Sequence, residues 1–235
     1  MSFASLCVLS FNRKKYLERS LETLWANTKY PYELIVLDDG SSERAVQEYI
    51  FQLARAKKVS TILMNTDHNM GIGIAVNRGF QIARGDYLFK LDADLDYKPG
   101  WLEHCVQLLE KHPLIGCMGL FKYWHRPCNF PDELIQTHED YHEVIDFVGS
   151  AIGMRREVYD EFGLWYELQH SFGEDKQFKV AVGDGGFQMA LPLEDVAVNF
   201  GFGEQHSSLI KEIDWEGHKH TYNVPTTTPL LFGGQ

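Results

Sequence analysis

The N-terminal part of the chain alternates between short apolar runs and longer segments with helical periodicity. The apolar runs are typical of buried strands and cover residues 4–10, 32–37, 59–65 and 87–91. The segments between them predict helices at residues 13–27, 43–56 and 74–83. Strands and helices that alternate at this spacing form a parallel sheet covered by helices. The expected fold class is therefore α/β, with a Rossmann-like, mostly parallel central sheet flanked by helices.

The second half of the chain is less regular. After Pro99 the pattern predicts helices at 100–111, 157–162 and 174–183, and strands at 115–123 and 196–200. Residues 125–141 form a polar, proline-containing excursion, and residues 144–154 are apolar with small side chains. A length of 235 residues suits one domain, which we place at 1–220 and follow with a loose tail at 221–235.

Composition indicates an ordinary globular protein and excludes one class of partner. Hydrophobic residues make up 44% of the chain and charged residues 23%, which is enough apolar material for a sizeable core. The chain has 33 acidic and 22 basic residues, a formal net charge of −11. A broad basic patch is not available at this charge, so we expect no nucleic-acid partner.

Cysteine usage and the N-terminus predict the compartment. Cys7, Cys105, Cys117 and Cys128 form no C-x-x-C pair and predict free, buried thiols in a reducing environment. The N-terminus has no charged leader before an apolar stretch. No apolar run reaches the roughly 18 residues that a membrane helix needs. We expect a cytoplasmic protein without a transmembrane segment, and peripheral membrane contact stays open.

The run from Tyr87 to Asp94 leads an apolar strand into two carboxylates one residue apart. Mg²⁺ and Mn²⁺ favour carboxylate oxygen and often bridge it to substrate phosphates. Ligands of such sheets bind outside the carboxyl ends of the strands. Polar residues that follow other predicted strands should lie at the same edge, namely Ser10, Asp38 and Asp39. The pattern therefore predicts a metal that holds a diphosphate at this edge.

The turn from Asp38 to Ser42 follows the second predicted strand. A carboxylate in this position can accept a hydrogen bond from the imide N–H of uracil or thymine. Gly40 permits a positive φ in the turn. Ser41 or Ser42, just before Glu43, can cap the next helix, and the two interpretations are compatible.

The order and spacing of several short motifs resemble the inverting family 2 glycosyltransferases of the GT-A fold. The resemblance covers residues 4–101 well and continues more weakly through Gly149-Ser150-Ala151, Gly173-Glu174-Asp175 and His206-Ser207-Ser208. The motifs of the first half that carry it are Ser10-Phe11-Asn12-Arg13, Leu37-Asp38-Asp39-Gly40-Ser41, Asn69-Met70-Gly71, Ala75-Val76-Asn77-Arg78-Gly79, Ala83-Arg84-Gly85-Asp86-Tyr87 and Leu91-Asp92-Ala93-Asp94.

The resemblance implies a nucleotide-sugar-binding half at 1–101 and an acceptor and catalytic half at 102–220. Arg78 is either a donor contact or an exposed helix residue. Which of Asp38 and Asp39 contacts the base is open. The donor-binding residues would be Ser10, Phe11, Asn12, Arg13, Asp38, Asp39, Asn69, Gly71, Asn77, Arg78, Asp92, Ala93 and Asp94.

The resemblance also implies a bound Mn²⁺ or Mg²⁺. Asp94 would be its direct ligand, and Asp92 would contact the ribose or a metal-bound water. His206 would complete the metal shell, with His218 and His220 as rivals for that role.

For the chemistry, the resemblance implies a general base at Asp175, with Glu174 as its rival. The reaction would be inverting transfer of a sugar from a UDP-sugar, or a dTDP-sugar, to an acceptor hydroxyl by single displacement. The acceptor would be a glycan, a lipid-linked molecule or a protein. A positioned base typically contributes about 10² to 10⁴ in rate.

Three alternatives remain beside this interpretation. Gly71-Ile72-Gly73 follows a strand, but Val76 stands where a dinucleotide fingerprint needs its third glycine. A sugar nucleotidyltransferase would carry a Gly-rich basic loop where Ser10 to Arg13 stand. A non-catalytic domain that binds a nucleotide sugar or a partner is the third, and the acids at positions 92, 94 and 175 speak against it.

Overall fold

A computed structural model describes residues 2–66, 68–122, 134–163, 165 and 174–201, and the backbone of 213–215 and 218–220. The helices are α1 (Lys14–Asn27), α2 (Arg44–Arg55), α3 (Ile72–Ile82), α4 (Trp101–Lys111), α6 (Arg156–Phe162) and α7 (Glu174–Asp184). The strands are β1 (Ala4–Ser10), β2 (Tyr32–Asp38), β3 (Thr61–Met64), β4 (Tyr87–Asp92), β5 (Leu95–Tyr97), β6 (Ile115–Gly119), β7 (Leu134–Thr137), β8 (Tyr141–Val144), β9 (Ala151–Arg155), β10 (Gln188–Pro192), β11 (Ala197–Asn199), β12 (Ile213–Trp215) and β13 (His218–His220).

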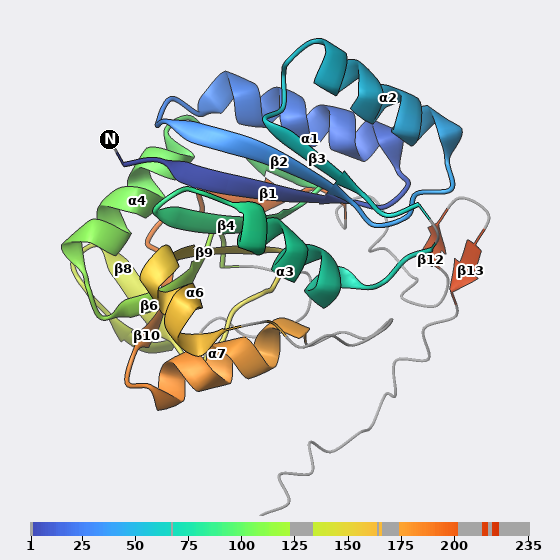
Figure 1. The fold of residues 1–235 in the computed structure, drawn as a ribbon. Coiled ribbons are helices and arrows are strands. Elements are labelled where there is room, and N and C mark those ends of the chain that lie inside the picture. The colour runs from blue at the N-terminus through green and yellow to red at the C-terminus, as the bar shows by residue number, and fades with distance from the viewer. Residues whose placement is uncertain are drawn as a thin grey trace, which may run out of the picture.

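A nine-stranded sheet in the order β3-β2-β1-β4-β9-β6-β10-β8-β7 forms the centre of the described residues. The pairings make seven of these strands run in one direction, while β8 and β9 run in the other. Figure 1 shows α1 and α2 on one face of the sheet and α3, α6 and α7 on the other. The predicted α/β class with a mostly parallel sheet is confirmed.

Side chains that alternate along the strands build two cores, one on each face of the sheet. On β1, Leu6 and Val8 pack into the core shared with α1 and α2, while Cys7 and Leu9 pack into the core shared with α3, α6 and α7. This two-residue period is what a strand buried on both faces requires. The first four parallel strands therefore form a rigid base for the loops at their carboxyl ends.

The second half adds detail that the sequence-based expectation lacks. In the apolar segment 144–154, a loop separates β8 from β9, and β9 inserts antiparallel between β4 and β6. The predicted strand 115–123 ends at Gly119, since residues 120–122 leave the sheet to bond the chain before β11. The predicted strand 196–200 forms β11, which pairs with β5 outside the main sheet.

Three of the four cysteines, Cys7, Cys105 and Cys117, are free and buried, and Cys128 lies outside the described residues. Burial raises the pKa of Cys117 to about 12, so this thiol stays protonated at neutral pH. None of the helices in the described part of the chain is long and apolar enough to span a membrane. The proposed tail at 221–235 lies outside the described residues.

Candidate active site

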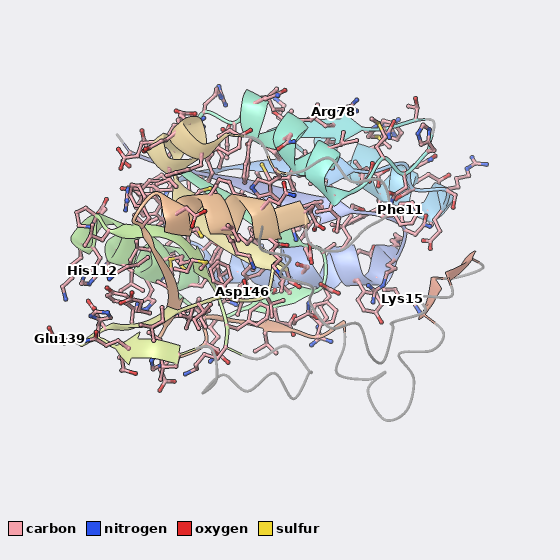
Figure 2. All side chains as sticks on the ribbon, turned by 90° about the horizontal axis from the view of Figure 1, so that it is seen from below. Phe11, Lys15, Arg78, His112, Glu139 and Asp146 are labelled. Atoms are coloured by element: carbon pink, nitrogen blue, oxygen red, sulfur yellow. The ribbon has the colours of Figure 1, made fainter. Side chains whose placement is uncertain are left out.

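The candidate site lies at the carboxyl ends of β1, β2 and β4. Strand register places Ser10 beside Asp38, and Leu9 beside Asp92, so the three strand ends are level. Two adjacent hollows open there, and Asp39 lines both. Figure 2 shows Phe11 and Arg78 at this end of the molecule, far from His112 and Glu139.

Most of the predicted donor residues line one hollow or the other. The first hollow is lined by Leu37, Asp38, Asp39, Leu63, Met64, Asn65, Ile74, Ala75 and Arg78. The second is lined by Leu9, Ser10, Phe11, Asn12, Arg13, Tyr16, Asp39, Asn69, Ile72, Asp92, Ala93 and Asp94. The structure thus brings together residues that the sequence places in five separate motifs.

Asn12 lines the second hollow and also holds the turn between β2 and α2. Its side-chain oxygen accepts hydrogen bonds from the backbone N–H of Ser42 at 2.9 Å and of Glu43 at 3.0 Å. It therefore fixes the turn that leads into α2 from a distant part of the chain. The expected cap by Ser41 or Ser42 is wrong, because Glu43 is the N-cap residue of α2 and its side chain makes no cap hydrogen bond. The Ser41 hydroxyl donates to Asp38 instead, at 2.5 Å.

Asp38 and Asp39 are both buried, but they face different partners. Asp38 accepts hydrogen bonds from the N–H and the hydroxyl of Ser41, while burial raises the pKa of its carboxyl above the usual value. Asp39 accepts one backbone N–H on each oxygen, from Met70 at 2.9 Å and Gly71 at 2.8 Å. Asp39 therefore fastens the loop before α3 to the sheet edge.

Glycines make this close approach between loops feasible. Gly71 has a φ of +101° and begins α3, and its N–H also contacts the side-chain oxygen of Asn69 at 3.0 Å. Gly40 has a φ of +80°, and a β-carbon there would lie 2.6 Å from the carbonyl carbon of His68. A larger residue at position 40 would push the two loops apart.

The two polar residues predicted from α3 have different surroundings. Asn77 is 1% exposed, and its amide bonds both the N–H and the carbonyl of Trp165, at 2.9 and 3.0 Å. Asn77 therefore anchors the chain near Trp165 and lines neither hollow. Arg78 is exposed and lines the first hollow beside Asp38 and Asp39.

Asp92 ends β4, and Ala93 and Asp94 form the turn into β5. Asp94 is 7% exposed, with an Arg13 guanidinium nitrogen 3.5 Å from one oxygen and the Asn199 amide 3.2 Å from the other. Burial, reinforced by the charge of Asp92, raises the pKa of Asp94 to about 6. A β-carbon at Gly201 would lie 2.1 Å from Asp94, so the chain passes directly over this carboxylate.

An aromatic stack stands beside this turn. The rings of Tyr16 and Phe200 stack with centroids 5.5 Å apart, and the Arg13 guanidinium lies 3.8 Å from the Tyr16 centroid. On the other side, Arg19 covers Phe200 at 4.1 Å and pairs with Asp96 at 2.5 Å. The stack fixes Arg13 next to Asp94.

Glu174 and Asp175 begin α7 and are buried near the same edge. Asp175 pairs with Lys179 at 2.9 Å, and a β-carbon at Gly149 would lie 2.5 Å from its carboxylate. One oxygen of Glu174 has no hydrogen-bond partner among the described residues. Burial raises the pKa of Glu174, Lys90 opposes this effect, and the charges of Asp175 and Asp92 add to it.

Two buried lysines were missed by reasoning from sequence. Lys90 is 1% exposed and Lys179 is 4% exposed, and each contacts a predicted site acid. Lys90 carried a usable signal, because a lysine in the apolar strand 87–91 needs a buried partner. Lys179 had none, since a lysine on an amphipathic helix is ordinarily solvated.

The histidine predictions cannot be placed. His206 lies outside the described residues, and only the backbone of His218 and His220 is described, in β13. Within the part of the chain that the structure describes, no three His, Cys, Asp or Glu side chains cluster closely enough to hold a metal by themselves.

The fold defines a class of protein by similarity to solved structures. One is GalNAc-T7 with UDP, GalNAc and Mn²⁺, at a TM-score of 0.67 and 18% identity, covering 81% of this chain and 41% of that one. Another is the mannosyltransferase PcManGT from Pyrobaculum calidifontis with GDP-Man and Mn²⁺, at a TM-score of 0.65 and 18% identity, covering 82% and 55%. The chain has the GT-A fold of these glycosyltransferases.

The chain belongs to glycosyl transferase family 2, whose model matches residues 5–163. An uncharacterised glycosyltransferase of Haemophilus influenzae is 26% identical, over 74% of this chain and 58% of that protein. The glucosyl-dolichyl phosphate glucuronosyltransferase of Haloferax volcanii is 27% identical, over 67% and 53%. The chain thus spans just over half the length of these two relatives.

The hydrogen bonds made by Asn12 give a stability prediction. Asn12 has a φ of +55°, so Asn12→Gly removes the acceptor of the Ser42 and Glu43 N–H groups without backbone strain, whereas Asn12→Ala removes it and adds strain. We expect urea unfolding to show a loss of about 1–2 kcal/mol for Asn12→Gly, and about 1 kcal/mol more for Asn12→Ala. Wild-type stability in both variants would show that Asn12 does not hold α2.

Proposed function

We propose that this protein is a metal-dependent inverting glycosyltransferase that moves a sugar from a nucleoside diphosphate donor, most readily a UDP-sugar or a dTDP-sugar, to an acceptor hydroxyl. The observation that carries the proposal is that acidic residues from three parts of the chain lie near one edge of the sheet. Asp39 lies at the shared wall of both hollows, Asp92 and Asp94 line the second, and Glu174 and Asp175 approach from α7. Because the chain belongs to glycosyl transferase family 2, we interpret these acids as the residues that serve sugar transfer.

Asp39 is the acid we assign to the base of the nucleotide. Each of its oxygens already accepts one backbone N–H, which fixes the carboxylate while leaving lone pairs for a further donor. Asp38 is instead engaged by Ser41 within its own turn. Phe11 lines the same hollow as Asp39 and offers a ring against which a base can stack.

The residues around Asp94 fit a divalent cation. Asp92 and Asp94 supply the carboxylate oxygens that Mn²⁺ and Mg²⁺ prefer, and the raised pKa of Asp94 shows that nearby cations offset its burial incompletely. We assign Asp94 as the direct ligand, because it stands at the second acid of the family's metal motif. Asp92, which Lys90 holds at 2.5 Å, would contact the ribose or a metal-bound water. When bound, the metal would stabilise negative charge on the departing diphosphate.

Asp175 is the base in this proposal. Lys179 holds its Oδ2 at 2.9 Å, which fixes the carboxylate and leaves Oδ1 for the proton of the acceptor hydroxyl. As the acceptor oxygen bonds the anomeric carbon, the bond from that carbon to the diphosphate oxygen breaks on the opposite face of the sugar. The proton passes to Asp175, and the configuration inverts. Glu174 is the weaker candidate because its free oxygen is fully buried.

Donor binding tests the metal assignment. Calorimetric titration of UDP, dTDP and GDP should show affinity that depends on Mn²⁺, and Asp94→Asn should weaken it by about 10- to 100-fold, because the replacement removes the carboxylate charge without changing its size. Asp184→Asn is the matched control, since Asp184 is exposed at the end of α7 and lines neither hollow. Undiminished Mn²⁺-dependent binding in Asp94→Asn would refute the ligand role.

Turnover tests the base. Asp175→Asn should lower kcat by about 10² to 10⁴ and leave UDP affinity near the wild-type value, because the base acts only on the acceptor. Glu174→Gln should reduce kcat far less. Nucleotide release from a panel of UDP-, dTDP- and GDP-sugars measures both variants. The reverse order of effects would transfer the base to Glu174.

A further inference from the structure

The loop at residues 146–149, which joins β8 to β9, receives a buried lysine from each side. Lys90 of β4 donates to the carbonyl of Gly149 at 2.6 Å and to Asp92 at 2.5 Å. Lys179 of α7 donates to the carbonyl of Phe147 at 2.6 Å, pairs with Asp175 at 2.9 Å and also contacts Asp146. Each lysine thus joins one site acid to the same loop.

Burial makes these contacts restrictive. A lysine that is 1% or 4% exposed must keep the polar partners of its side chain, since water cannot replace them. Burial alone would lower the pKa of Lys179, but Asp175 and Asp146 raise it above its usual value, so this lysine is charged. The ring of Phe147 lies 4.9 Å from the same ammonium and closes the remaining side.

The loop also touches the acids directly. A β-carbon at Gly149 would meet the Asp175 carboxylate at 2.5 Å, so the backbone of Gly149 already packs against that group. The next residue, Ser150, accepts the backbone N–H of Asp92 at 2.9 Å through its carbonyl. Figure 2 shows Asp146 at the middle of the molecule, beside α7.

We propose that Lys90 and Lys179 are positioning residues that fix the donor-side acid Asp92 and the base Asp175 at a set separation by fastening both to the 146–149 loop. This inference rests on the proposed transferase function. A separation of this kind matters because a displacement of about 1 Å between reacting groups can cost about 100-fold in rate. Both lysines act through other residues and do not touch the reacting atoms.

The two lysines should separate donor binding from turnover. Lys90→Met should weaken Mn²⁺-dependent UDP binding by about 10- to 100-fold, because Asp92 loses its orientation. Lys179→Met should lower kcat by a similar factor while the Kd for UDP stays within about threefold of wild type. Lys98→Met and Lys176→Met are matched controls on exposed lysines near the same elements and should change neither quantity.

UDP titration with Mn²⁺ gives the Kd, and UDP release from UDP-glucose, UDP-N-acetylglucosamine and UDP-glucuronate gives kcat. The inference would be overturned if both variants lost UDP affinity and kcat together, or if neither variant changed either quantity. An active wild type would in that case still support the proposed function. A wild type that releases nucleotide from none of these donors, nor from the dTDP- and GDP-sugars of the wider panel, would refute the proposed function and the inference with it.

Asp146→Asn provides a second route if a buried-lysine variant does not fold. The Asp146 side chain is 44% exposed, so the substitution spares the core while weakening the hold of Lys179 on the loop. We expect kcat to fall by about 10-fold at unchanged UDP affinity. An unchanged kcat in a folded Asp146→Asn protein would overturn the role of Lys179.

Discussion

Negative charge concentrated at one edge of the sheet is the constraint on which the rest of this structure depends. Burial raises the pKa of three carboxyls there, Asp38, Asp94 and Glu174. At the opposite edge Glu33 is equally buried, yet hydrogen bonds from Ser5 and Arg84 overcome the effect of burial and lower its pKa. The contrast shows that the partners of Glu33 outweigh its burial, whereas burial outweighs the partners of the three carboxyls at the candidate site.

Basic side chains from several elements offset part of the negative charge at this edge. Arg13 approaches Asp94 from the loop after β1, Lys90 reaches Asp92 from within β4, and Lys179 reaches Asp175 from α7. Each cation is itself fixed by a ring or a carbonyl, so the acids are held in defined positions. A site prepared in this way would need little reorganisation to bind the proposed metal and diphosphate.

The sequence predicted the first half of the fold and the residues that gather at its edge. Strand periodicity located β1, β2 and β4, and parallel pairing then required Asp38, Asp39 and Asp92 to meet. The role of Asn12 was not predictable, because it holds the turn before α2, thirty residues away, through the tertiary fold. The antiparallel insertion of β9 was equally hidden, since an apolar strand does not encode its direction or its neighbours.

Crystals grown with UDP and Mn²⁺, measured at a wavelength where manganese scatters anomalously, test the central claim most directly. The account predicts one strong anomalous peak within coordination distance of Asp94, with the diphosphate beside it and the base against Asp39. A manganese peak remote from Asp94, or a nucleotide bound away from the ends of β1, β2 and β4, would contradict the account.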